Sequence, residues 1–262
     1  MTTYDTVQLE IDKNRIATVS LNRPEKNNAF NAQMISELIS VFHALADESH
    51  VRFMILRGRG RHFSAGADLS WMQASAALDY AANLKDAHEL GELMSLLHSL
   101  PFPTIAVVHG GAFGGAVGLT ACCDIAIGTP DAVFSLSEVR IGLVPGVISS
   151  YVVKAIDERA TRRYALTGER FSGIRAREIG LLAETYEATE LDAAVEQWVE
   201  SLLPNGPQAM RSCKALLQRV GDGTLGPDLR QFTEETIAAI RISAEGQEGL
   251  NAFLQKRKPS WT

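Results

Sequence analysis

Two glycine-rich segments have residue types suited to binding a carbonyl oxygen. HGGAFGGAVGL, residues 109–119, places five glycines and two alanines in eleven positions after the apolar run TIAVV. FSAGAD, residues 63–68, follows the apolar run FMILRG. Small residues let backbone N–H groups approach a ligand, and two such groups aimed at one oxygen form an oxyanion hole, in which each donor contributes about 2.7–4 kcal/mol of transition-state stabilisation. The alternative is close helix–strand packing without a ligand.

The segment FSLSEVRIGLVPG, residues 134–146, adds one carboxyl group in apolar surroundings. Glu138 follows a predicted short strand and precedes a Gly-x-x-Pro-Gly turn. Apolar surroundings raise the pKa of a carboxyl group, which suits it to transfer a proton near neutral pH. The alternative is a structural ion pair between Glu138 and Arg140.

The sequence lacks the motifs typical of several other classes of function. The glycine-rich segments have neither a Gly-Lys-Ser/Thr sequence nor Gly-x-Gly-x-x-Gly spacing, which argues against a phosphate loop. Three cysteines and six histidines show no metal-ligand spacing, so no metal is expected. The net charge of −6 argues against nucleic acid as a partner. No apolar run is long enough for a membrane span and the N-terminus lacks a signal core, so we expect a cytoplasmic protein.

Short apolar strands alternating with helices predict an α/β fold with a mainly parallel sheet. A hairpin is expected from TVQLEI and IATVSLN, followed by a helix capped by Asn31 and a long helix over 78–100. Loops at the carboxyl ends of parallel strands form a ligand crevice, which is where both glycine-rich segments fall. Beyond about residue 145 the pattern is nearly all helical, with helices from Pro207 and over 229–242 and 244–256. We therefore expect a core over 1–200 and a helical region over 201–262.

Five segments, in their order and spacing, resemble the enoyl-CoA hydratase/isomerase (crotonase) superfamily: LNRPEKNNAFN, FSAGADL, HGGAFGGAVGL with CCDIAI, FSLSEVRIGLVPG and AFLQKRKPSW. The resemblance implies a crotonase-like spiral of ββα units and a helical C-terminal trimerisation region in a homo-trimer or hexamer (a dimer of trimers). It also implies an acyl-CoA thioester whose carbonyl is bound by the backbone N–H groups of Ala67 and Gly115.

The same resemblance implies where coenzyme A would bind. Because coenzyme A is part of the substrate, no separate cofactor is expected. Ala65, Asp68, Leu69 and Ser70 would contact the substrate, with the 67–70 segment along the coenzyme A arm. Lys258, with its neighbours Lys256 and Arg257, is a candidate for the phosphates. The alternative for this basic cluster is a solvated helix C-terminus, which the helix dipole favours.

The chain departs from this pattern at Gly118. Hydratases of the family commonly carry a second glutamate three residues after the oxyanion-hole glycine, and here that position is Gly118. Gly118 is still expected among the substrate contacts. Either Glu138 works alone, or another group orients the water: a side chain from residues 71–98 or the distal carboxylate of the substrate. A single glutamate also resembles the Δ3,Δ2-enoyl-CoA isomerases.

FSAGADLSWM, the CCD segment and LSEVRIGL resemble bacterial hydratases of branched glutaconyl-CoA thioesters. The leading interpretation is hydration of 3-methylglutaconyl-CoA or isohexenylglutaconyl-CoA, with Glu138 as general acid–base. Arg140 is a candidate to bind the distal carboxylate of the substrate, or else a structural ion-pair partner. The width of the acyl pocket would depend on Trp71, Met72 and Tyr151. The alternatives are an enoyl-CoA isomerase and a non-catalytic protein that binds RNA or protein; the acidic charge and Glu138 disfavour the latter.

Overall fold

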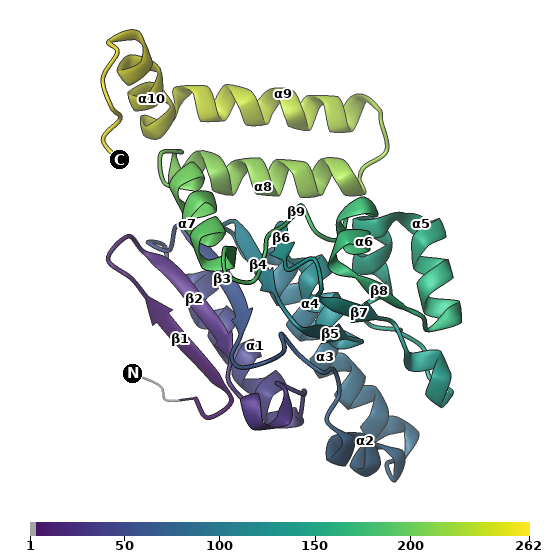
Figure 1. The fold of residues 1–262 in the computed structure, drawn as a ribbon. Helices are drawn as coiled ribbons and strands as arrows, with labels where there is room; N and C mark the ends of the chain where they lie inside the picture. The colour runs from purple at the N-terminus through teal and green to yellow at the C-terminus, as the bar shows by residue number, and fades with distance from the viewer. Residues whose placement is uncertain (1–3) are drawn as a thin grey trace. The chain divides into compact units, whose positions relative to one another are not determined.

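The structure is a computed structural model that describes residues 4–262, and it divides into two compact units (Figure 1). The first unit comprises the residues up to Leu100 and Thr104–Asp192, and the second comprises Pro101–Pro103 and Ala193–Thr262. The sequence places the boundary near residue 200, whereas the compact units divide after Asp192. None of the helices described is long and apolar enough to cross a membrane.

The first unit is built on a six-stranded sheet in the order β1-β2-β3-β4-β6-β9. β1 and β2 form the predicted antiparallel hairpin, and every other neighbouring pair is parallel. All five residues of β4 are buried, as expected for a strand covered on both faces. The strands are β1 (Val7–Ile11), β2 (Ile16–Leu21), β3 (Phe53–Gly58), β4 (Thr104–Val108), β6 (Ile125–Gly128) and β9 (Glu184–Thr185).

A second, three-stranded sheet joins the glycine-rich segments. β5 (Gly111–Phe113) pairs in parallel with β7 (Val133–Ser135), which pairs antiparallel with β8 (Arg170–Ser172). Single bridges connect Ser64 with Ala112 and Phe30 with Ala67. The sequence did not predict β5, because three residues containing a glycine give no periodic signal. This short strand holds the two glycine-rich segments next to each other.

The helices of the first unit largely confirm the sequence-based expectations. Asn31 caps α1, because its side chain accepts a hydrogen bond from the N–H of Met34. The expected helix over 78–100 is α3, whereas α2 was not predicted. The helices are α1 (Ala32–Asp47), α2 (Leu69–Ala76), α3 (Tyr80–Ser99), α4 (Gly115–Cys122), α5 (Ser149–Thr167) and α6 (Gly173–Glu178), with 3-10 turns at Pro24–Lys26 and Glu138–Ile141.

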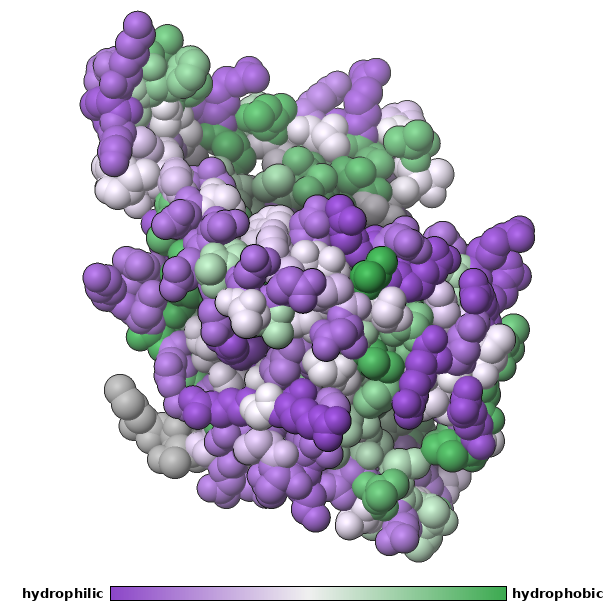
Figure 2. Space-filling view, in the orientation of Figure 1, coloured by the Kyte–Doolittle hydropathy of each residue, from purple (hydrophilic) through white to green (hydrophobic). Residues whose placement is uncertain are grey.

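The second unit is helical, as predicted. Glu245 accepts hydrogen bonds from the N–H groups of Gln208 and Ala209 and so caps α8, while the indole of Trp261 donates to the carbonyl of Pro204. Its helices are α7 (Leu191–Leu202, from residue 193 onward in this unit), α8 (Pro207–Asp222), α9 (Pro227–Ile242) and α10 (Ala244–Leu254). Figure 2 shows hydrophobic side chains at the surface of these helices. Those that are exposed include Leu217, Leu225, Ile237, Ile242, Leu250, Phe253 and Leu254.

Gly118 lies in α4, where the neighbouring space is already filled. A Cβ atom at this position would lie 2.2 Å from Cγ2 and 2.8 Å from Cβ of Ile148, and 3.3 Å from the sulfur of Met94. Ile148 is 3% exposed and branches at Cβ, so it has little freedom to move aside. The position lacks a side chain because an apolar neighbour occupies its space.

We therefore expect Gly118→Ala to lower the free energy of unfolding by about 1–3 kcal/mol, the usual cost of overpacking a core. Gly91→Ala in α3 is the matched control, since its Cβ would lie 3.8 Å from the nearest atom, in Val147. Removing a helical glycine there should be neutral or stabilising by up to about 1 kcal/mol. Urea denaturation of both variants measures the difference, and equal stability would contradict the packing at Gly118.

Candidate active site

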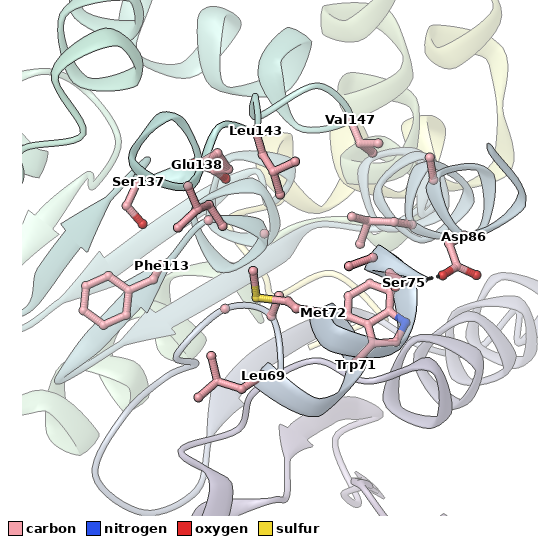
Figure 3. A pocket seen from close by; sticks show the side chains of 18 of the residues that line it. Leu69, Trp71, Met72, Ser75, Asp86, Phe113, Ser137, Glu138, Leu143 and Val147 are labelled. Atoms are coloured by element: carbon pink, nitrogen blue, oxygen red, sulfur yellow. Dashed lines mark hydrogen bonds between the residues drawn. The ribbon is translucent and has the colours of Figure 1, made fainter. Parts of the chain in front are cut away.

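A cavity of about 810 Å³ lies in the first unit, where the glycine-rich segments meet α2 and α3 (Figure 3). Most of its lining is apolar, and its polar side chains are few. The segments Ala65–Ala67 and Phe113–Gly115 form one part of the wall, with Ser137 and Glu138 beside them. A concave apolar site with few polar groups is the usual form of a small-molecule site.

Two backbone N–H groups in this wall have no acceptor within the protein. Ala67 and Gly115 both line the cavity. Among the hydrogen bonds formed by residues 4–262, neither backbone N–H donates to a protein atom. Gly115 is the first residue of α4, where the N–H groups of a helix lack partners and attract negative charge. The two groups are therefore available to an oxygen that carries developing negative charge.

Gly66 and Gly114 make this arrangement sterically possible. Gly66 has φ +84°, and a Cβ there would lie 2.8 Å from the carbonyl oxygen of Phe113. Gly114 has φ +53°, and its Cβ would lie 3.0 Å from Oε1 of Glu138. Both positions combine a positive φ with a close approach, which any side chain would hinder. Because neither glycine has a side chain, the Phe113 backbone can lie close to Gly66, and the carboxyl group of Glu138 can lie close to Gly114.

Glu138 is the carboxyl group next to these backbone groups. It begins the 3-10 turn at Glu138–Ile141, and its Oε2 is buried without a hydrogen-bond partner. Burial raises the pKa of this carboxyl above 4.5, and a hydrogen bond from its own backbone N–H counters the shift in part. Among the residues described, no ion pair joins Arg140 to this carboxyl, and Arg140 does not contribute to the shift of its pKa. These properties favour proton transfer over a structural ion pair.

The expected substrate-binding residues fall into three groups. Ala65 and Leu69 line the main cavity, whereas Asp68 and Ser70 line a smaller one of about 370 Å³ that also includes Arg23 and Lys26. Asp68 lies 3.1 Å from Arg23, an ion pair that helps to lower the pKa of Asp68 although burial acts against it. In the second unit, Lys258 belongs to the tail that follows α10.

Two expected contacts, Gly118 and Arg140, are in the lining of neither cavity. Gly118 is buried, and Ile148 fills the space where its side chain would lie, as described above. Arg140 is exposed, and its side chain packs along Gly168. A Cβ atom added at Gly168 would lie 2.9 Å from Nε of Arg140. The expectation that these two residues bind substrate is not met by this arrangement.

Several lining residues were not singled out from the sequence. Ser75, Asn83 and Asp86 bring polar groups from α2 and α3 into the cavity. They fall within the 71–98 window from which a water-orienting group was expected, but no pattern distinguished them from solvent-facing residues. Of the residues expected to set the pocket width, Trp71 and Met72 line it. Tyr151 does not line it and packs edge-on against His98.

Comparisons with known proteins agree with this geometry. A family model described as enoyl-CoA hydratase/isomerase matches residues 12–262. The crystal structure of an enoyl-CoA hydratase from Shewanella pealeana superimposes with a TM-score of 0.94 at 45% identity, covering 98% of this chain and 96% of that one.

Two relatives in the sequence comparison carry specific names. The 2,3-dehydroadipyl-CoA hydratase of Escherichia coli is 27% identical, covering 94% of this chain and 95% of the relative. The hydroxycinnamoyl-CoA hydratase-lyase of Pseudomonas fluorescens is 30% identical, covering 98% and 96%. These relatives span nearly the whole chain.

The raised pKa of Glu138 predicts a pH-dependent stability. As pH rises above about 4.5, the carboxyl group ionises in the unfolded chain before it ionises in the folded one, so its contribution to stability falls until pH exceeds the folded pKa. Glu138→Gln keeps the shape and removes this titration. Its melting temperature relative to the unchanged protein should therefore rise over the pH range that starts at about 4.5 and extends above it. A difference that stays constant over that range would show that burial does not penalise the ionised carboxyl.

Proposed function

Because the chain belongs to the enoyl-CoA hydratase/isomerase family, we propose that it adds water to the double bond of a 2-enoyl-CoA thioester. The observation that carries this proposal is the pair of unpartnered N–H groups at Ala67 and Gly115 beside the unpartnered carboxyl of Glu138. The first two groups bind a thioester oxygen and the third transfers a proton. The hydratase names of the relatives support the same reaction class.

The proposed mechanism follows from these three groups. The thioester oxygen accepts hydrogen bonds from Ala67 and Gly115, which strengthen as negative charge develops on it. Glu138 takes a proton from water as the water oxygen bonds to C3, and the electrons of the double bond pass toward the thioester to form an enolate. Glu138 then returns a proton to C2, which restores the thioester carbonyl. Water is the only reactant consumed besides the thioester.

The substrate that we propose is a branched glutaconyl-CoA, with a methyl or isohexenyl branch. The motif resemblance supports it, and so does the single carboxyl group next to the N–H pair. With Ile148 in the space beside Gly118, no second glutamate orients the attacking water. In a glutaconyl thioester the carboxylate of the substrate lies close to C3 and supplies an acceptor for that water. A group held close to the reacting atom replaces a separate binding event and so lowers the barrier.

An enoyl-CoA isomerase is the second candidate. A single carboxyl group is sufficient to move a proton between two carbons, and the filled space at Gly118 favours a one-carboxylate mechanism. The two reactions are distinguished by their products. Hydration adds the mass of one water, whereas isomerisation leaves the mass unchanged.

We place the coenzyme A arm along the 67–70 segment. The smaller cavity there carries the basic side chains of Arg23 and Lys26, which suit a phosphate-bearing ligand. Lys258 stays a proposed phosphate contact. Arg257 is less available, because its guanidinium forms a two-pronged ion pair with Glu248.

The helices of the second unit support self-association into a homo-trimer or a dimer of trimers. Phe253 and Leu254 of α10 are 81% and 75% exposed, and Ile242 at the end of α9 is 79% exposed. Large apolar side chains gathered on one unit are typical of a protein–protein contact. Light scattering at micromolar concentration should give the mass of three or six chains, and a monomer would contradict the proposal.

Glu138→Gln should lower the rate of hydration by about 100-fold or more, the usual effect of removing a general acid–base. Thioester binding should change little, since the amide keeps the shape of the carboxyl. Mass spectrometry of the products and binding of a saturated acyl-CoA measure the two effects. Undiminished turnover by the variant would remove Glu138 from the mechanism.

The substrate proposal predicts a preference between two thioesters with the same reacting bond. Glutaconyl-CoA should show a kcat/KM over 100-fold above that of crotonyl-CoA, about 3 kcal/mol, because crotonyl-CoA lacks the carboxylate near C3. Arg140→Gln should leave this ratio unchanged, since Arg140 lies outside the cavity lining. Comparable values for both thioesters would return the protein to the class of ordinary short-chain hydratases.

A further inference from the structure

The end of the main cavity away from Glu138 carries polar side chains that the mechanism does not use. Figure 3 shows Asp86 and Ser75 on the opposite side of the cavity from Glu138. They come from α3 and α2, among apolar lining residues such as Ala87 and Leu90. We call this part of the cavity the far end, defined by Trp71, Ser75, Asn83 and Asp86.

At the far end, the side chains of Ser75 and Asn83 donate their hydrogen bonds within the protein, so mainly acceptors remain for a ligand. The hydroxyl of Ser75 donates to Oδ2 of Asp86 at 3.3 Å (Figure 3, dashed line), so its proton is already used. The amide of Asn83 donates to the carbonyls of Leu78 and Asp79, at 3.0 and 3.1 Å. These three side chains therefore offer only oxygen lone pairs to a ligand. The indole N–H of Trp71 is the remaining side-chain donor at the far end.

The ionisable side chains that line the cavity are all acidic. Asp86 and Glu138 are the two ionisable side chains in its described lining, which includes no Lys, Arg or His. A substrate carboxylate brought next to Asp86 would meet a like charge without a cation to balance it. Like charges brought together discriminate strongly against a ligand, and a neutral donor such as an indole does not offset them.

We propose that Asp86 is a specificity-determining residue that keeps a carboxylate out of the far end and admits a neutral branch. The proposal rests on the proposed hydration of a branched glutaconyl thioester, whose C3 carries both a carboxymethyl arm and a neutral arm. Exclusion at Asp86 directs the neutral arm to the far end. The carboxylate arm then stays on the side of C3 away from Asp86.

The test compares two saturated thioesters of equal length, octanoyl-CoA and its ω-carboxyl counterpart suberyl-CoA, by competition binding to the full-length protein. The unchanged protein should bind the neutral thioester at least about 10-fold more tightly, the effect of one like charge across a partly solvated cavity. Asp86→Asn should reduce this preference by about 5-fold or more, mainly by improving suberyl-CoA binding. Asp86→Ala should do the same, although it lacks the acceptor for Ser75.

Glu89→Gln is the matched control. It removes one negative charge from α3 outside the cavity lining, and its ion pair with Lys85 is a 3.9 Å surface contact. The neutral preference should persist in this variant, which separates a local effect from the overall charge of the helix.

Equal affinities in the unchanged protein, or a neutral preference that is undiminished in both Asp86 variants, would overturn the assignment. Loss of the preference in Glu89→Gln as well would also overturn the assignment to Asp86, because the overall negative charge of α3 would then explain the preference. The assay uses thioesters that cannot react, so its result does not depend on turnover. Failure to hydrate any enoyl-CoA would instead count against the proposed function.

Discussion

The site depends on two backbone N–H groups that the fold leaves without an acceptor. Ala67 is held by its bridge to Phe30, and Gly115 begins α4 immediately after β5. The bridge between Ser64 and Ala112 keeps the two segments in register. Positive φ angles at Gly66 and Gly114 allow this approach, at a cost that a non-glycine residue would raise by roughly 1–2 kcal/mol. An arrangement of this kind is stable only if both segments are fixed by their neighbours, which is the role of the small three-stranded sheet.

The environment of the single carboxyl group follows from the same packing. Glu138 comes directly after β7, and Gly114 lets its Oε1 approach the start of α4. Apolar neighbours raise the pKa of the carboxyl, whereas the N–H groups attract negative charge on an adjacent oxygen. One end of the cavity therefore carries the two N–H groups and the carboxyl group with the raised pKa, while the far end presents hydrogen-bond acceptors and the carboxyl group of Asp86. The cavity has a polarity that distinguishes its two ends.

Local patterns in the sequence were sufficient to predict the elements that hold the site. The alternation in β1 and β2, the cap at Asn31 and the glycines after β3 and β4 each reflect a local rule, and the structure confirms the hairpin, α1 and the loops. What was missed depends on contacts between distant segments. β5 forms only because β7 offers a partner, and Asp86 faces a cavity only because the fold brings Ser75 of α2 next to it. Likewise, no local pattern shows that Arg140 packs along Gly168 or that Ile148 fills the space beside Gly118.

The contact between Gly118 and Ile148 has an evolutionary consequence. A second carboxylate three residues after Gly115 requires a side chain at 118 and a smaller one at 148, because the two positions share one volume. A side chain added at 118 alone overpacks the core, and a smaller side chain at 148 alone leaves a void. Both changes reduce stability. The two positions are therefore epistatic: the effect of a change at one depends on the residue at the other. Descent from a two-glutamate ancestor, or return to one, requires paired substitutions, which makes the one-carboxylate site a state that single mutations do not readily leave.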